Sequence, residues 1–165
     1  MSFTLSNAAY RVAYQEWVDL HKWDHPYAVT LTFKQKVAFK KPSLGEDVYI
    51  NPDIAAQNVS YFFHLLDRSS FGNHAARFEK FVHRFSVCEH TDTKNLHYHM
   101  AVNRPLNIAD EAFRFKIKKC WSKTIWGDVQ MDIQSSANNG WIEYMMKPRD
   151  KADYQASVDI LNTRF

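Results

Sequence analysis

The stretch "VHRFSVCEHTDTKNLHYHMAV", residues 82–102, predicts two β-strands joined by a short polar connection. Residues 82–89 and 96–102 are rich in apolar and β-branched side chains, and the polar segment "TDTKN" (91–95) separates them. Two such runs with a short polar segment between them are typical of an antiparallel β-hairpin. This hairpin decides the fold, because it interrupts an otherwise regular alternation of strands and helices.

Further strands and helices are predicted on both sides of the hairpin. Strands are expected at residues 25–34, where Pro26 opens the strand, and at residues 127–134, where apolar and polar residues alternate. Asn51 as an N-cap and Pro52 in the first turn predict the start of a helix. The expected helices cover residues 7–23, 51–71, 108–125, the later part of 135–147 and part of the stretch up to Phe165, with a loop at 41–47. This order of elements predicts an α+β fold, in which helices pack on an antiparallel sheet.

The composition predicts one globular domain that spans residues 1–165. Hydrophobic residues make up 45% of the chain, and 21 Lys and Arg residues stand against 18 Asp and Glu residues. The two cysteines, Cys88 and Cys120, lack CxxC spacing, which predicts a reducing compartment such as the cytoplasm. The sequence has neither an apolar run of 18 residues nor an apolar signal segment, so we expect no membrane span and no export by a standard signal.

Two stretches combine basic and aromatic residues. They are "FKQKVAFKK" (33–41) and "RFKIKKCWSK" (114–123). Patches of this kind suit a polyanion such as nucleic acid, although charge runs are also common on the solvated faces of ordinary elements. The lysines that we expect to contact nucleic acid are Lys34, Lys36, Lys40, Lys41, Lys116, Lys118 and Lys119.

Two histidines of the hairpin are candidate metal ligands. Residues i and i+2 of a strand share a face, so the Cβ atoms of His97 and His99 are expected about 6.5–7 Å apart, while Tyr98 points the other way. Both imidazoles could then reach one metal ion at about 2.0–2.2 Å. Glu89 on the partner strand would add a carboxylate, and such a set of nitrogen and oxygen ligands suits Mn²⁺ or Mg²⁺.

Other interpretations of the histidines stay open. His90 competes with Glu89 as the third ligand if the strand ends or bulges at that point. The histidines could also be satisfied core residues, or they could belong to a zinc site. A zinc site would need a further Cys or His nearby, and Cys88 is expected on the opposite face from Glu89.

The segment "WIEYMMKP" (141–148) contains a candidate nucleophile. Tyr144 and Lys147 are three residues apart, so a helix would place both on one face. Tyrosine can act as a covalent nucleophile, but its phenol has a pKa of about 10 and needs a base, a metal ion or a nearby cation. The ordinary alternative is a packed aromatic ring beside a lysine whose charged end reaches solvent.

The ordered set of "VTLTF" (29–33), "HYH" (97–99) and "YMMK" (144–147) resembles the three motifs of the HUH endonucleases. The chain looks most like the single-tyrosine nuclease domain of rolling-circle replication initiators, the Rep proteins. The resemblance spans residues 27–147 and implies a five-stranded antiparallel sheet with flanking helices, related to the RRM and ferredoxin-like folds.

The resemblance also implies roles for individual residues. Glu89, His97 and His99 would hold a divalent metal ion, Mn²⁺ or Mg²⁺, and Tyr144 would attack a phosphate of single-stranded DNA. The products would be a 5′-phosphotyrosine link and a free 3′-hydroxyl, with Lys147 beside the phosphate. The threonines of the first motif, Thr30 and Thr32, join the lysines named above as expected DNA contacts.

The expected partner is single-stranded DNA at an origin or at a stem-loop nick site, together with a host replication helicase or polymerase. No Walker A sequence is present, so the chain is expected to be a compact initiator of a plasmid or phage, or a trimmed domain of a longer initiator. A eukaryotic-virus origin would place the protein in the host nucleus rather than in the cytoplasm.

Two alternative functions stay open. One is a single-tyrosine transposase of the insertion-sequence type, and the other is a non-catalytic RRM-like module that binds nucleic acid through exposed aromatic residues. The second tyrosine of this region, Tyr154, lies beyond Pro148 and is expected to be structural.

Overall fold

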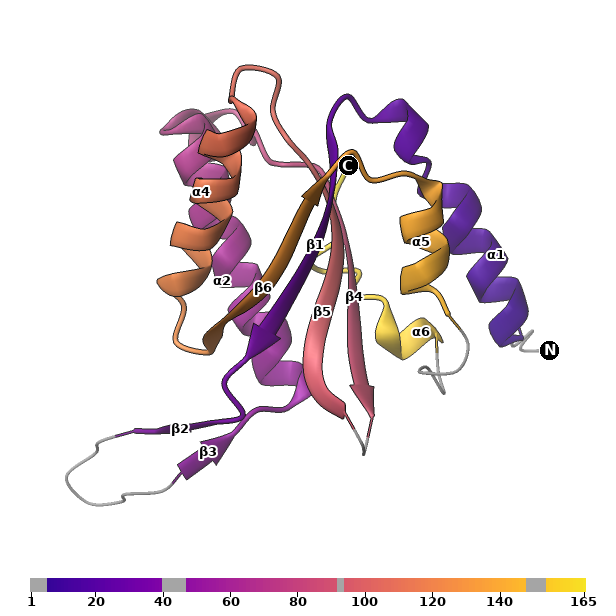
Figure 1. The fold of residues 1–165 in the computed structure, drawn as a ribbon, viewed down its shortest axis with the longest axis vertical. Helices are drawn as coiled ribbons and strands as arrows, with labels where there is room; N and C mark the ends of the chain where they lie inside the picture. The colour runs from indigo at the N-terminus through magenta and orange to yellow at the C-terminus, as the bar shows by residue number, and fades with distance from the viewer. Residues whose placement is uncertain (1–5, 40–46, 92–93, 148–153) are drawn as a thin grey trace.

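The computed structural model describes residues 6–39, 47–91, 94–147 and 154–165. Its central sheet is antiparallel, with four strands in the order β4-β5-β1-β6 (Figure 1). The strands are β1 (Pro26–Phe33), β4 (Arg84–Thr91), β5 (Lys94–Asn103) and β6 (Gly127–Ser135). Helices flank this sheet, so the predicted α+β class is confirmed, while the described residues form four strands in the sheet rather than five.

The C-terminal segment occupies the place beside β4 where a fifth strand would lie. After a single helical turn, α6 (Tyr154–Ser157), it forms isolated bridges between Val158 and Val87 and between Arg164 and Arg84. The backbone N–H of each arginine donates to the carbonyl of the other at 2.8 Å. Part of this stretch was expected to be a longer helix, but the outer edge of β4 offers backbone groups that an extended chain can satisfy.

A separate pair of short strands follows β1. The strands β2 (Lys36–Ala38) and β3 (Asp47–Tyr49) form a two-stranded sheet that projects from the end of the central sheet (Figure 1). The sequence predicted only a loop at 41–47, because strands of three residues carry too little pattern to be recognised. Lys40 and Lys41 lie outside the described residues.

Two long helices cover one face of the central sheet (Figure 1). They are α2 (Pro52–Phe71) and α4 (Asp110–Ser122), and the short helix α3 (His74–Arg77) follows α2. The side chain of Asn51 accepts a hydrogen bond from the Ile54 N–H at 2.9 Å, which confirms the predicted N-cap. The apolar side chains that the strands direct toward these helices include Tyr27, Val29, Leu31, Phe33, Tyr98, Met100 and Val102.

The opposite face of the sheet is covered only in part. There α1 (Asn7–Trp17), the 3₁₀ turn η1 (Leu20–Lys22) and α5 (Asn139–Met145) accompany α6 (Figure 1). Their core with the sheet is smaller and includes Phe85, Val87, Ala101, Ile142, Met145 and Met146. The polar residues that share this face, Thr30, Thr32 and His97, are only half-buried. No helix in the described ranges is long and apolar enough to cross a membrane.

A buried ion pair links α2 to the start of β4. The Arg84 guanidinium lies 2.9 Å from the Asp67 carboxylate, and the two side chains are 10% and 14% exposed. Burial lowers the pKa of Arg84, and the neighbouring Asp67 opposes this shift. The guanidinium also stacks on Phe63, 4.3 Å from its ring centroid. Removal of the carboxylate would therefore leave a desolvated charge without its counterion.

We expect Asp67→Ala to lower the free energy of unfolding by about 3–5 kcal/mol, because one partner of a buried ion pair is lost. The measurement is urea denaturation followed by circular dichroism. The control is Asp47→Ala, which removes the exposed Lys36–Asp47 pair, 2.7 Å long, and should cost less than about 1 kcal/mol. Equal losses in the two variants would contradict the assignment.

Candidate metal and nucleophile site

The register of three strands brings the candidate ligands together on the partly covered face. Glu89 of β4 lies opposite His97 of β5, as the hairpin predicted, and His97 in turn lies opposite Thr32 of β1. His99 lies opposite Thr30 in the same pairing. Because side chains alternate along a strand, these residues all project to the side of the sheet that carries α5.

The side chains of Glu89, His97 and His99 form a compact group. The carboxylate of Glu89 lies 3.2 Å from Nε2 of His99 and 3.7 Å from Nε2 of His97. One ligand atom from each residue lies within 4.8 Å of the others, and Glu89 and His99 are only 6% and 5% exposed. A buried carboxylate is stable where a positive charge accompanies it. The three residues could therefore hold a metal ion, with one oxygen and two nitrogen donors.

In each histidine, the nitrogen that faces away from Glu89, Nδ1, has its own hydrogen-bond partner. Nδ1 of His97 lies 2.8 Å from the carbonyl of Asn95, and Nδ1 of His99 lies 2.9 Å from the hydroxyl of Thr30. Since a carbonyl can only accept, the His97 Nδ1 carries the proton in this hydrogen bond, so Nε2 is the atom of His97 that could bind a metal ion beside Glu89. Such outer contacts orient metal-binding imidazoles in known sites. Thr30 thus acts on His99 in addition to its predicted role at DNA.

The alternative metal ligands, His90 and Cys88, do not join the group formed by Glu89, His97 and His99. His90 is exposed and is not part of the group, so the geometry favours Glu89 as the third ligand. Cys88 packs against the core on the α2 and α4 side, as the strand alternation predicted. Tyr98 is also on that side, where its hydroxyl donates to Asp159 at 2.8 Å and burial raises its pKa far above the usual value. Tyr98 is therefore a structural residue.

Helix α5 places Tyr144 directly against the histidines. The rings of Tyr144 and His99 meet edge to face, with centroids 5.4 Å apart and an angle of 83° between the planes. Tyr144 remains 43% exposed and lines a hollow, so the residue is accessible from solvent. The expected nucleophile and the expected metal ligands thus belong to one site, although they lie more than 40 residues apart in the sequence.

Lys147 lies just beyond the end of α5. The helix was predicted to end at Lys147, before Pro148, but it ends at Met145, and Pro148 lies outside the described residues. Even so, the Lys147 ammonium group sits 4.0 Å from the centroid of the Tyr144 ring. A cation in this position stabilises negative charge that develops on the phenol oxygen.

Trp141 is a member of the site that the sequence analysis did not identify. Its ring stacks on Tyr144 with centroids 5.2 Å apart and 9° between the planes, and it meets His99 edge to face at 5.4 Å. Its indole N–H donates to the carbonyl of Met100 at 2.9 Å, which ties α5 to β5. Trp141 and Tyr144 are three residues apart, so a helix places both on one face, and this spacing could have identified Trp141 from the sequence.

The predicted basic patches do not all gather at this site. Lys116, Lys118 and Lys119 lie on α4, which covers the other face of the sheet, and Lys116 donates to the carbonyl of Ser69 at 2.7 Å. Lys34 is exposed at the end of β1 and donates to the carbonyl of Ile125, while Lys36 pairs with Asp47 on the projecting hairpin. The sequence patches are thus divided between two faces, and Lys147 is the described lysine that contacts the site.

Two hollows flank the ligand group and Tyr144. One, of about 280 Å³, is lined by Thr32, Asn95, His97 and Gln130. The other, also of about 280 Å³, is lined by Ala28, Gln134, Ser136, Trp141 and Tyr144. An extended ligand that crossed β1 and β6 would therefore find room on both sides of the histidines.

We expect Mn²⁺ to bind the wild-type protein and to bind Glu89→Gln far more weakly, because the substitution removes the only carboxylate of the ligand group. Thr30→Val should weaken binding by about 10–100-fold, since it removes the hydrogen bond that orients His99. Both effects can be measured by titration with Mn²⁺ and detection of the free ion by electron paramagnetic resonance.

The control for this titration is His90→Gln, which changes the neighbouring residue of β4 without changing the ligand group. Its Mn²⁺ affinity should equal that of the wild type. If His90→Gln lost binding while Glu89→Gln kept it, the third ligand would be His90 and the assignment of Glu89 would be wrong.

Comparison of the chain with models of protein families, with characterised proteins and with solved structures gave no match. A proposal about the function of this site must therefore be argued from the geometry and chemistry of its own side chains.

Proposed function

We propose that the protein is a metal-dependent endonuclease and strand transferase for single-stranded DNA, with Tyr144 as the nucleophile. The observation that carries the proposal is the edge-to-face contact of the Tyr144 ring with His99, which is one of three clustered candidate ligands. A tyrosine placed in this way is accessible, has a cation beside it, and borders a group that could hold a metal ion.

Glu89, His97 and His99 would hold the divalent ion. The donor set of one carboxylate and two imidazoles, without a thiolate, favours Mn²⁺ or Mg²⁺ over a structural zinc ion. When bound, the ion would supply a positive charge for a non-bridging oxygen of the phosphodiester.

The chain's own residues account for the chemical step. The Tyr144 oxygen forms a bond to phosphorus, and the bond between phosphorus and the 3′ oxygen breaks. The phenol proton passes to solvent, and the departing 3′ oxygen takes a proton from water, so the products are a 5′-phosphotyrosine and a 3′-hydroxyl. Lys147 offsets the negative charge on the phenol oxygen as the proton leaves. The covalent link preserves the phosphodiester energy, so a 3′-hydroxyl can later reverse the step.

Initiation of rolling-circle replication is the biological role that we propose for this chemistry. The DNA would be single-stranded at an origin or at a stem-loop. A host helicase would unwind the duplex, and a host polymerase would extend the released 3′-hydroxyl. The buried strand aromatics argue against a purely RRM-like module. Within the described residues of the central sheet, every Phe and Tyr side chain is buried, namely Tyr27, Phe33, Phe85 and Tyr98.

We expect Tyr144→Phe to abolish covalent capture of single-stranded DNA in Mn²⁺, because the attacking oxygen is gone while the ring contacts remain. The measurement is a gel-shift of the denatured protein after incubation with a random oligonucleotide library. The control is Tyr61→Phe, which removes another exposed tyrosine hydroxyl, on α2, and should leave the adduct yield unchanged.

A denaturation-resistant adduct with Tyr144→Phe would show that another residue is the nucleophile. Absence of any adduct or cleavage with the wild-type protein, across the whole library, would favour a non-catalytic DNA-binding protein.

We expect DNA binding to weaken as salt rises, because contacts between lysines and phosphates release counterions. Lys147→Gln should reduce the slope of log affinity against log salt by about 1, since one such contact is lost. Lys116→Gln is the matched control, because the Lys116 side chain is already hydrogen-bonded at the end of α2, on the other face. Fluorescence anisotropy with a labelled oligonucleotide measures both slopes, and equal changes in the two variants would rule out Lys147 as the contact.

A further inference from the structure

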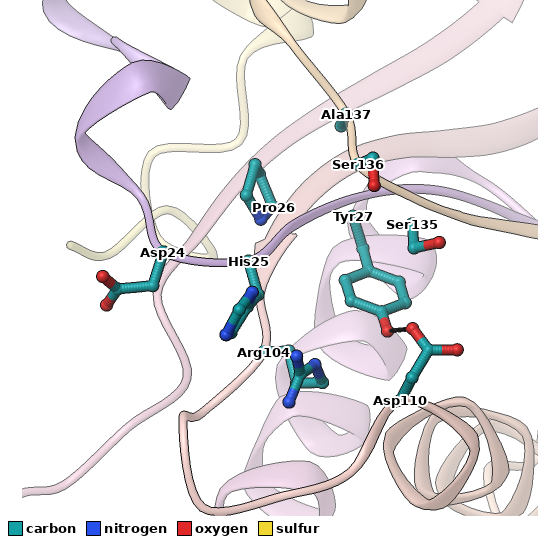
Figure 2. A pocket seen from close by; sticks show the side chains of 9 residues that line it. All are labelled: Asp24, His25, Pro26, Tyr27, Arg104, Asp110, Ser135, Ser136 and Ala137. Atoms are coloured by element: carbon teal, nitrogen blue, oxygen red, sulfur yellow. Dashed lines mark hydrogen bonds between the residues drawn. The ribbon is translucent and has the colours of Figure 1, made fainter.

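A cavity of about 350 Å³ lies at the start of β1, away from the ligand group. Its walls come from β1, from the segment that connects β5 to α4, and from the end of β6. Figure 2 shows Arg104 between His25 and Asp110, with Tyr27 beside Asp110 and Ser136 at the rim. This volume lies within the range of pockets that bind small ligands.

The cavity borders the hollow that contains Tyr144. Both are lined by Ser135, Ser136 and Ala137, so this turn is all that separates the cavity from the Tyr144 hollow along the shared side. Tyr27, in the cavity wall, and Thr30, which bonds His99, are three residues apart on β1, about 10 Å along the strand, and their side chains project to opposite faces of the sheet. A strand of DNA held at Tyr144 would reach the cavity by passing over the turn at residues 135–137, which would place a neighbouring nucleotide there.

The cavity carries hydrogen-bonding groups with unused capacity. The Tyr27 hydroxyl donates to one oxygen of Asp110, and Nε of Arg114 donates to the other at 2.9 Å, so each oxygen keeps a second lone pair. Arg104 donates through one terminal nitrogen, Nη1, to the carbonyl of Ile108. A guanidinium has five N–H donors, so this single hydrogen bond leaves further donors for a ligand.

The balance of charge favours a neutral ligand over a phosphate. Arg104 and Asp110 have opposite charges and lie close together in the cavity, and the carboxylate of Asp24 at the rim points away from them (Figure 2). A phosphate would meet the carboxylate of Asp110 at short range, which is unfavourable. A neutral group that both donates and accepts hydrogen bonds would satisfy both side chains.

The backbone at the junction of the two hollows has an unusual conformation. Ser136 has a φ of 62°, in the left-handed region that is uncommon for residues other than glycine. The next residue, Ala137, donates its N–H to the carbonyl of Pro26 at 2.9 Å and holds this turn against the start of β1. Strained residues of this kind gather at ligand-binding sites. This turn forms the wall that the cavity and the Tyr144 hollow share.

We propose that this cavity binds the guanine base of a nucleotide beside the phosphate that Tyr144 attacks, and so contributes to the choice of the cleavage site. Guanine presents two acceptors, O6 and N7, that suit the guanidinium of Arg104. Its N1–H and amino group are donors that suit the carboxylate of Asp110. The half-buried ring of His25 flanks the guanidinium and offers a face for the base (Figure 2). This inference rests on the proposed DNA cleavage.

The test is sequencing of the DNA that becomes covalently attached to each protein from a randomised single-stranded library in Mn²⁺. For the wild type we expect enrichment of guanine of about tenfold or more at one position beside the cleaved bond. Arg104→Gln and His25→Ala should both lose this enrichment while still forming adducts through Tyr144. The control is Arg77→Gln, which removes an exposed guanidinium on α3 and should keep the wild-type preference.

The outcomes separate this inference from the proposed function. If the wild type forms no adduct, the proposed cleavage fails. If adducts form but guanine is not enriched, or if both variants keep the wild-type preference, the cleavage stands and the guanine site is wrong. His25→Ala keeps the test decisive should Arg104→Gln unfold, because the His25 backbone N–H, rather than its ring, makes the hydrogen bond to Asn103.

Discussion

The antiparallel register between β4 and β5 is the constraint on which the site depends. It places Glu89 opposite His97 and Val87 opposite His99, so that a carboxylate and two imidazoles meet on one face. A shift of one residue in either strand would send that strand's ligands to the α2 and α4 core. That core fixes the register, because Tyr98 and Met100 must be buried under the helices, and both have an exposed fraction of 1% or less.

The helices cover the two faces of the sheet unequally, and this leaves the candidate ligands accessible. On one face, α2 and α4 bury most of the strand side chains. The rings of Phe33 and Phe62 pack there on Trp121, with centroids 5.1 and 5.5 Å from its ring. On the other face, α1 and α5 leave Thr32 and His97 half-buried beside a hollow. A polyanion could reach the ligands only on this second face. The division also explains why lysines on α4 do not reach the site.

The sequence predicted much of the fold and the centre of the site from local patterns. Alternation along the hairpin was enough to place His97 and His99 on one face, with Glu89 as a candidate third ligand, because strand geometry relates neighbours in a simple way. The choice between Glu89 and His90 needed the observed register of β4 and β5. It was not enough to identify Trp141, whose role depends on how α5 docks on β5. The pairing of the C-terminal segment with β4 was missed for the same reason, since isolated bridges at Val87 and Arg84 leave no periodic pattern. Lys116 appeared to belong to a free basic patch, because its contact with Ser69 is long-range.

The placement of Tyr144 combines a fixed helix with an accessible side chain. Asn139, at the start of α5, accepts a hydrogen bond from the Leu20 N–H at 2.8 Å and donates to Asp19 at 3.2 Å. Trp141 adds a third tie, to the carbonyl of Met100. These hydrogen bonds hold α5 against the segment that follows α1 and against β5 of the sheet. A helix of only seven residues would be marginally stable without them. If Tyr144 is the nucleophile that we propose, it would need little reorganisation to meet a phosphate at the histidines, and rigid placement of reacting groups is a large part of what a protein can contribute to phosphoryl transfer.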